Sequence, residues 1–137
     1  MEESTLLDLI FKLQKKCNLK NDAFIEEIEI SQAEYNMFIC LKNCKHFNSY
    51  SIAAKMNLSL SRVSRIIDKM VNKTYLTRNT NKVDRRAIDI KMTAKGKAIL
   101  ALIVEHLDQR EAEMVKQLND AEILDIKSSL EKLINLS

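Results

Sequence analysis

The sequence contains no proline and only one glycine, Gly96. Since these two residue types interrupt helices most strongly, their scarcity favours a mainly helical fold. No run of apolar residues is long enough to span a membrane. The N-terminal stretch MEESTLLDLIF is acidic where a signal peptide would be basic, so we expect a cytoplasmic protein.

The length and composition indicate one globular domain. The chain has 137 residues, of which 46% are apolar and 30% are charged. That balance is too apolar for a disordered chain. A domain of this size often needs a partner subunit to bury enough apolar surface, so an oligomer is compatible with the length.

The positive charge is concentrated in the middle of the chain. Residues 55–97 contain twelve Lys and Arg against three acids, whereas the remainder is net acidic. Such clustering is the electrostatic pattern expected of a protein that binds a polyanion, and it favours nucleic acid. The alternative is a lysine-rich surface that only meets solvent, which would fit scattered charges better.

Four helices are predicted in the first half of the sequence. An apolar stripe at 3.6-residue spacing predicts a helix over 5–17, and the pair Ser31 and Glu34 forms a capping box for a helix that begins near Gln32. Ser49 is expected to cap a short helix over 50–56 that ends at an asparagine. Ser59 is expected to cap a fourth helix to about residue 73. Two helices around a tight turn, the second of them basic, predict a helix-turn-helix.

A β-hairpin and two long helices follow. Residues 75–79 and 87–92 have strand-forming composition or alternation and flank a polar loop. Thr93 is expected to cap a helix from 94 to about 118, and the pair Asn119 and Glu122 marks a last helix. The predicted fold class is mainly α with a small β-hairpin wing, a winged helix-turn-helix flanked by helices.

The fourth helix has one apolar and one polar face. Its apolar positions, Val63, Ile66, Ile67 and Met70, must face the core. Opposite them lie hydroxyls and basic side chains, which suit a helix in the major groove because they reach phosphates and guanine edges. The residues on or beside this face are Ser59, Ser61, Arg62, Ser64, Arg65, Asp68 and Lys69. The alternative is a solvated face without a partner.

The hairpin loop adds more positive charge next to this helix. Lys82, Arg85 and Arg86 lie in the loop, and a narrow minor groove attracts inserted arginines. Asp84 is the one acid there, and we expect it to pair with a nearby arginine and fix the shape of the loop. The alternative is a surface turn whose charge is incidental.

Together these stretches resemble the MarR family of winged helix-turn-helix regulators. The matching motifs are SYSIAAKMNLSLSRVSRIIDKMVNKTYLTR, the D-x-R wing signature that begins at Asp84, and IKMTAKGKAI, which fits the family's L-T-x-x-G entry into the fifth helix. The chain departs from the family at 72–74, where a glycine is usual, and at Met92, where leucine is usual. The first departure concerns the turn before the wing.

The resemblance implies a single MarR-like domain over 1–137, with a winged part at 30–97 and dimerisation helices at 1–29 and 98–137. It implies a homodimer on a pseudo-palindromic DNA operator, most often a repressor that responds to a small ligand or an oxidant. Arg86 fits the family's minor-groove arginine, and Arg85 is the candidate for a backbone phosphate. By position, Phe11, Tyr35 and Phe38 are candidates for a ligand cleft.

The cysteines carry the remaining open interpretations. Cys17, Cys40 and Cys44 are an odd number, which argues against a disulfide framework. They lie on apolar stripes, where cysteine commonly acts as a small hydrophobe, and thiol sensing is the second interpretation. With two histidines in the chain, a metal site is not expected, nor is a cofactor.

No catalytic constellation or phosphate-binding glycine loop is visible, so we do not expect an enzyme. The leading hypothesis is therefore a DNA-binding regulator. The alternative is a winged-helix protein–protein interaction module whose basic face meets an acidic partner.

Overall fold

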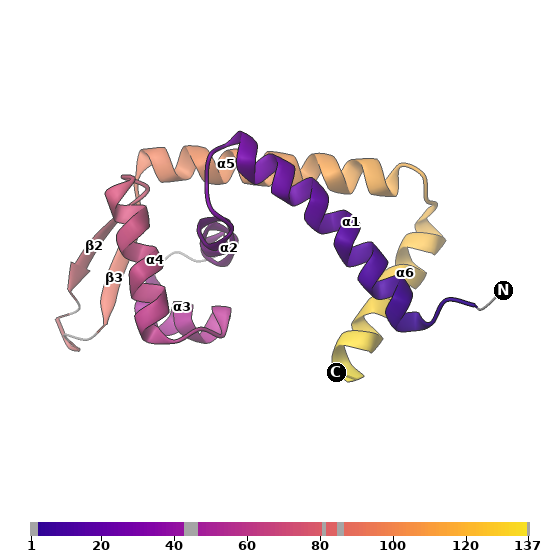
Figure 1. Ribbon diagram of the computed structural model, residues 1–137, viewed down its shortest axis with the longest axis horizontal. Helices are drawn as coiled ribbons and strands as arrows, with labels where there is room; N and C mark the ends of the chain where they lie inside the picture. Colours follow the sequence, from indigo (N-terminus) through magenta and orange to yellow (C-terminus); the bar gives the residue numbers. More distant parts are fainter. Residues whose placement is uncertain (1–2, 43–46, 81, 85–86, 137) are drawn as a thin grey trace. The chain divides into compact units, whose positions relative to one another are not determined.

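The computed structural model describes residues 3–42, 47–80, 82–84 and 87–136 (Figure 1). The chain divides into two compact units, residues 1–100 and 101–137, and the boundary falls within one helix. The first unit contains the predicted winged helix-turn-helix. The prediction of a single domain with dimerisation helices at both ends stays a prediction.

The first unit begins with two capped helices. Helix α1 (Leu6–Glu27) starts at Thr5, which forms a capping box with Asp8. It ends ten residues beyond the predicted end at residue 17, because nothing between 18 and 27 interrupts the backbone, and the chain turns only at Glu29 with a φ of 59°. Helix α2 (Gln32–Leu41) starts at the predicted capping box of Ser31 and Glu34.

A short strand that the sequence pattern did not predict precedes the third helix. Strand β1 (Phe47–Asn48) has two residues, too few to show alternation. In α3 (Ser49–Met56) the predicted cap was wrong, because the side chain of Asn48, not Ser49, accepts the hydrogen bond from the Ser51 N–H at 2.8 Å. Ser49 is instead buried, and its hydroxyl accepts a hydrogen bond from the Ile88 N–H at 2.9 Å.

The helix-turn-helix itself agrees with the prediction. Asn57 ends α3 in the left-handed conformation, with a φ of 53°. Ser59 caps α4 (Leu60–Asn72) by accepting a hydrogen bond from the Arg62 N–H at 3.2 Å. The predicted core residues of α4, Val63, Ile66, Ile67 and Met70, are all buried. Figure 1 shows α4 between α3 and the strands of the hairpin.

The wing is a three-stranded antiparallel sheet with strand order β1-β3-β2. Strands β2 (Leu76–Thr80) and β3 (Ile88–Met92) form the predicted hairpin, in register from Leu76 opposite Met92 to Thr80 opposite Ile88. Leu76 and Ile90 are buried, so one face of the sheet contributes to the core of the unit.

The wing is joined to helix α5 (Ala94–Val115) by a compact junction. Thr93 caps α5, since its hydroxyl accepts the Gly96 N–H at 3.0 Å, and its own N–H donates to the Tyr75 carbonyl at 3.0 Å. Gly96 packs so closely here that an added Cβ would overlap that carbonyl. The single glycine of the chain is therefore required by a close backbone approach.

The second unit contains the rest of α5 and helix α6 (Asp120–Leu136), which begins at the predicted capping box of Asn119 and Glu122. No described residue of α6 is buried, although its sequence is rich in leucine and isoleucine. Among the described helices none is long and apolar enough to cross a membrane.

Candidate nucleic-acid interface

The outward face of α4 carries hydroxyl and basic side chains. Ser61, Arg62, Arg65 and Lys69 are exposed, and Ser64 is half-buried. They alternate with four buried apolar residues, so the amphipathic pattern of α4 separates a core face from a polar face. Ser59 is also exposed, but its hydroxyl already accepts the capping hydrogen bond.

An ion pair that the sequence pattern did not indicate joins this face to the wing. The Arg78 guanidinium on β2 contacts the Asp68 carboxylate on α4. Both side chains are about half exposed, so the pair contributes little stability, on the order of 0–1 kcal/mol. Its larger effect is electrostatic and geometric, because it neutralises the one acid on the polar face and links β2 to α4.

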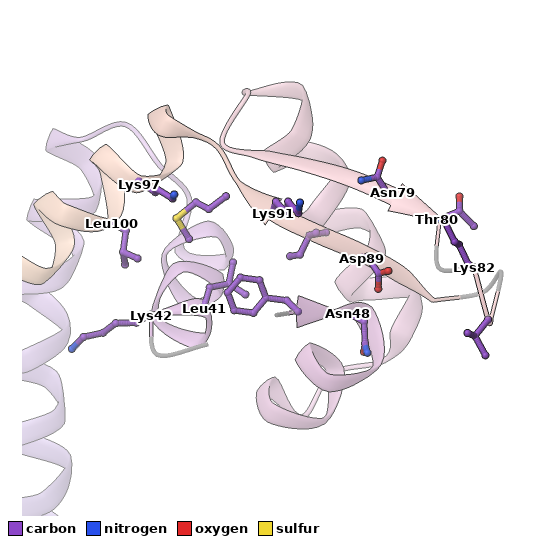
Figure 2. Close-up of a pocket in the computed structure, with 14 residues that line it drawn as sticks. Leu41, Lys42, Asn48, Asn79, Thr80, Lys82, Asp89, Lys91, Lys97 and Leu100 are labelled. Atoms are coloured by element: carbon purple, nitrogen blue, oxygen red, sulfur yellow. The ribbon is translucent and has the colours of Figure 1, made fainter. Parts of the chain in front are cut away.

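The hairpin loop extends the positive surface beyond the sheet. Lys82 is exposed and lies at the tip, past the last paired residues of the strands (Figure 2). On the returning side, the Ala87 N–H donates to the Asp84 carbonyl at 3.0 Å, so Asp84 takes part in a turn through its backbone. Arg85 and Arg86 lie outside the described residues, and their predicted roles stay predictions.

A second ion pair holds the C-terminal end of α4. The Lys73 ammonium, next to the last residue of the helix, contacts Glu34 Oε1 of α2 at 2.7 Å. Glu34 is only 1% exposed, and the same oxygen accepts the Ser31 N–H at 2.8 Å. Burial alone would raise the pKa of Glu34, but the hydrogen bonds from Lys73 and Ser31 outweigh it and hold that pKa below its ordinary value.

A hollow lies between α2 and the helix-turn-helix. Its lining includes Tyr35 and Cys40 from α2, Met56 from α3, and Arg62 from α4. Of the three predicted cleft residues, only Tyr35 lines it. Phe38 is buried in the core with its ring edge-on to Tyr75, and Phe11 is a largely exposed residue of α1.

A second hollow runs along the sheet, and most of its charged lining residues are basic. Figure 2 shows Lys91 and Lys97 on this side, with Asn79 and Asp89 on the paired strands. Lys42 and Lys82 also line it, so four lysines surround a single acid. This arrangement extends the positive surface of the wing.

The cysteine positions permit both interpretations of the sequence. Cys17 and Cys40 do not take part in a disulfide, and both are half-buried. Cys44 lies outside the part of the chain that the structure describes. Within that part, no three histidine, cysteine or acidic side chains gather closely enough to hold a metal ion.

Both the sequence and the fold are similar to those of known proteins. The MarR family model matches residues 30–88. The multiple antibiotic resistance protein MarR of Escherichia coli is 24% identical over 125 residues, covering 88% of this chain and 84% of that protein. The transcriptional regulator SarZ of Staphylococcus saprophyticus is 23% identical over 133 residues, covering 97% of this chain and 90% of SarZ. Residues 30–88, which contain the helix-turn-helix and the first strand of the hairpin, are thus similar to the MarR family.

Solved structures of MarR-type proteins share the fold over nearly the whole chain. Staphylococcus aureus MepR in its DNA-binding conformation superposes with a TM-score of 0.78 at 20% identity, covering 96% of this chain and 98% of MepR. A mutant of MepR bound to an oligodeoxyribonucleotide superposes with a TM-score of 0.66 at 21% identity, covering 97% and 98%. These structures show that the chain shares the fold of MepR, and of the two relatives above, SarZ is a transcriptional regulator by name.

The turn before the wing, at 72–74, contains a residue with a positive φ. The family usually has a glycine in this turn, and here Thr74 adopts the left-handed conformation, with a φ of 64°. A β-branched residue rarely adopts this conformation, so the backbone at Thr74 is strained.

Proposed function

We propose that the chain is a dimeric repressor that binds a pseudo-palindromic DNA operator, with α4 in the major groove and the wing in the minor groove. The observation that carries this proposal is the exposed, basic and hydroxyl-rich face of α4, which the Arg78–Asp68 pair links to a hairpin that also carries basic side chains. A single DNA duplex can contact both surfaces, because its two grooves lie side by side.

The side chains divide into two groups by what they reach. A helix enters the major groove with its exposed face toward the base edges, so Arg62 and Arg65 are the candidates for guanine contacts. Hydroxyls and lysines at the margins suit phosphates. The proposed DNA-binding residues are Ser59, Ser61, Arg62, Ser64, Arg65, Lys69, Lys82, Arg85 and Arg86, and Asp84 is proposed to shape the wing.

The terminal helices support the dimer. Six large apolar residues of α1, including Leu6, Leu9 and Leu13, are more than half exposed, and α6 exposes Leu124 and others to a similar degree. Two amphipathic helices that expose so much apolar surface within one chain are expected to bury it against a second copy. A symmetric dimer would then place its recognition helices about one DNA turn apart, on the order of 34 Å.

The hollow beside α4 supports a response to a small effector. It is lined by α2, α3 and α4 together, so a ligand there would contact Tyr35, Arg62 and the Cys40 thiol. We propose this hollow as the effector site and Cys40 as the thiol best placed for an oxidant. Among the described residues, Phe11, Phe38 and Cys17 do not line this hollow and are weaker candidates, and Cys44 lies outside the described residues.

The test is a titration of duplex DNA over a salt series. The duplex is selected by the wild-type chain from a randomised library, and binding is measured by fluorescence anisotropy. The logarithm of the association constant should fall linearly with the logarithm of salt, because several phosphate contacts release counterions. If no duplex is enriched and none binds at low salt, the regulator proposal fails and an interaction module with an acidic protein partner becomes the better explanation.

Single substitutions test the assignment of the face. Arg62→Ala and Arg65→Ala should each cost about 1–3 kcal/mol of binding free energy and relax specificity at one base pair. Lys15→Ala, on the exposed surface of α1, is the matched loss of one positive charge and should have little effect. Equal effects of all three substitutions would show that only net charge matters and that the face assignment is wrong.

A further inference from the structure

The tip of the wing exposes an apolar side chain almost completely. Val83 is 97% exposed, more than any other large apolar residue in the described part of the chain, where the next is Leu136 at 75%. The other exposed large apolar residues all lie on helices. Val83 therefore differs from them in both exposure and position, and the dimerisation helices do not account for it.

Val83 lies in the loop of the hairpin, beyond the last paired residues of the two strands. Strand pairing ends with Thr80 opposite Ile88, and the hydrogen bond from the Ala87 N–H to the Asp84 carbonyl closes the returning side. Val83 directly precedes that turn, and the exposed Lys82 precedes Val83. Turns favour glycine, asparagine, aspartate and serine, so a valine here is not explained by turn formation.

The side chain of valine suits an apolar contact from which water is excluded. Its side chain is stiff at χ1, so it loses little entropy when it is buried. Within its own chain it is almost completely exposed, and only a partner can bury it. Lys82 beside it supplies the charge that would hold the tip against phosphates.

We propose that Val83 is a specificity-determining residue that enters the DNA minor groove and disfavours guanine. This inference rests on the proposed DNA-binding function. The minor groove is about 6 Å wide, enough for a side chain, and its floor differs between base pairs mainly by the guanine N2 amino group. The guanine amino group would keep a valine above it from contacting the floor of the groove. The valine would also bury the amino N–H, which would then have no hydrogen-bond acceptor.

An A·T pair at the same position has no such group, so the valine packs closely against the groove. The expected preference is about tenfold for A·T over G·C, the order of magnitude for one unpaired buried donor. An inosine·cytosine pair, which lacks the N2 amino group, should behave like A·T.

The experiment uses the full chain and the duplex enriched by the wild type from a randomised library. Hydroxyl-radical cleavage locates the base pairs that the wild type protects in the minor groove, and these pairs are then made A·T, G·C or inosine·cytosine. Anisotropy titrations compare wild type, Val83→Ala and Val83→Thr. Circular dichroism verifies that each variant is folded, which the exposure of position 83 leads us to expect.

Wild type should bind the A·T and inosine duplexes about tenfold more tightly than the G·C duplex, and Val83→Ala should reduce this ratio below about threefold. Threonine has the shape of valine but its hydroxyl can accept the amino hydrogen, so Val83→Thr should recover affinity for G·C. Lys82→Ala should weaken binding to all three duplexes by one common factor.

Three results would overturn the inference: no discrimination by wild type, the same discrimination by Val83→Ala, or an equal loss on all three duplexes. If Val83→Ala discriminates as the wild type does, the preference for A·T comes instead from basic side chains that bind a narrow minor groove. If the wild type enriches no duplex at all, the proposed function itself has failed, so the two failures are distinguishable.

Discussion

Replacing Gly96 with alanine should destabilise the first unit substantially. An added Cβ would overlap the Tyr75 carbonyl oxygen and approach Met92 Cγ to 2.8 Å. The Tyr75 carbonyl cannot move freely, because it accepts hydrogen bonds from the Thr93 N–H at 3.0 Å and from the Thr93 hydroxyl at 3.1 Å. Alanine would stabilise the helix by about 1 kcal/mol, whereas overpacking costs about 1–3 kcal/mol and two weakened hydrogen bonds about 2 kcal/mol more. The expected net loss is about 2–4 kcal/mol.

Urea unfolding followed by circular dichroism measures this loss, at equal protein concentration because a dimer's stability depends on concentration. Lys97→Ala, on the same turn and exposed, is the matched control and should change stability by less than about 0.5 kcal/mol. Met92→Ala combined with Gly96→Ala removes only the side-chain contact and should not restore stability. If Gly96→Ala is as stable as the control, or if Met92→Ala rescues it, the backbone clash is not the reason for this glycine.

Three further predictions concern the same unit. Thr74→Gly should stabilise the unit by about 0.5–1 kcal/mol in urea unfolding. Glycine removes the strain of the left-handed conformation, about 1–2 kcal/mol, and its greater loss of backbone entropy on folding costs less than that. An unchanged or lower urea midpoint would contradict this prediction. Lys73→Met should destabilise the unit by about 1–2 kcal/mol near pH 7, because it removes the cation that contacts Glu34. The lowered pKa of Glu34 contributes stability that is lost as pH falls through the acid range, so the difference between the variant and the wild type should shrink near pH 4. A difference that does not depend on pH would refute the role of that carboxylate. Ser49→Ala should cost about 1–3 kcal/mol by thermal or urea unfolding, because the Ile88 N–H loses its acceptor; a neutral result would mean that water replaces the hydroxyl.

The local features of the fold were predictable because they depend on neighbours in sequence. Capping boxes at Ser31 and Asn119, each with its glutamate three residues on, correctly placed the starts of α2 and α6. The 3.6-residue spacing in α4 correctly separated its core from its polar face. Asn48 and Ser49 are neighbouring candidates for the cap of α3. Which of them caps the helix depends on β3, because the Ile88 N–H donates its hydrogen bond to the Ser49 hydroxyl.

Contacts between distant segments were not predictable in the same way. Glu34 was identified as a capping residue, but its second role, as the acceptor for Lys73, depends on a partner 39 residues away. The Arg78–Asp68 pair likewise depends on the path of β2 beside α4. Composition indicated a basic region, but only the fold determines which acids neutralise it.

These long-range contacts have a consequence for regulation. Helix α4 is held by the Ser59 cap at its start, by Arg78 along its length and by Glu34 just beyond its end. A helix fixed at three points should move together with α2 and β2, so an effector in the hollow between α2 and α4 is expected to shift the whole winged unit and not to bend the helix. Weakening the last contact with Lys73→Met should therefore lower DNA affinity by a similar factor on every duplex. A change in base preference in that variant would instead show that α4 reorients by itself within the unit.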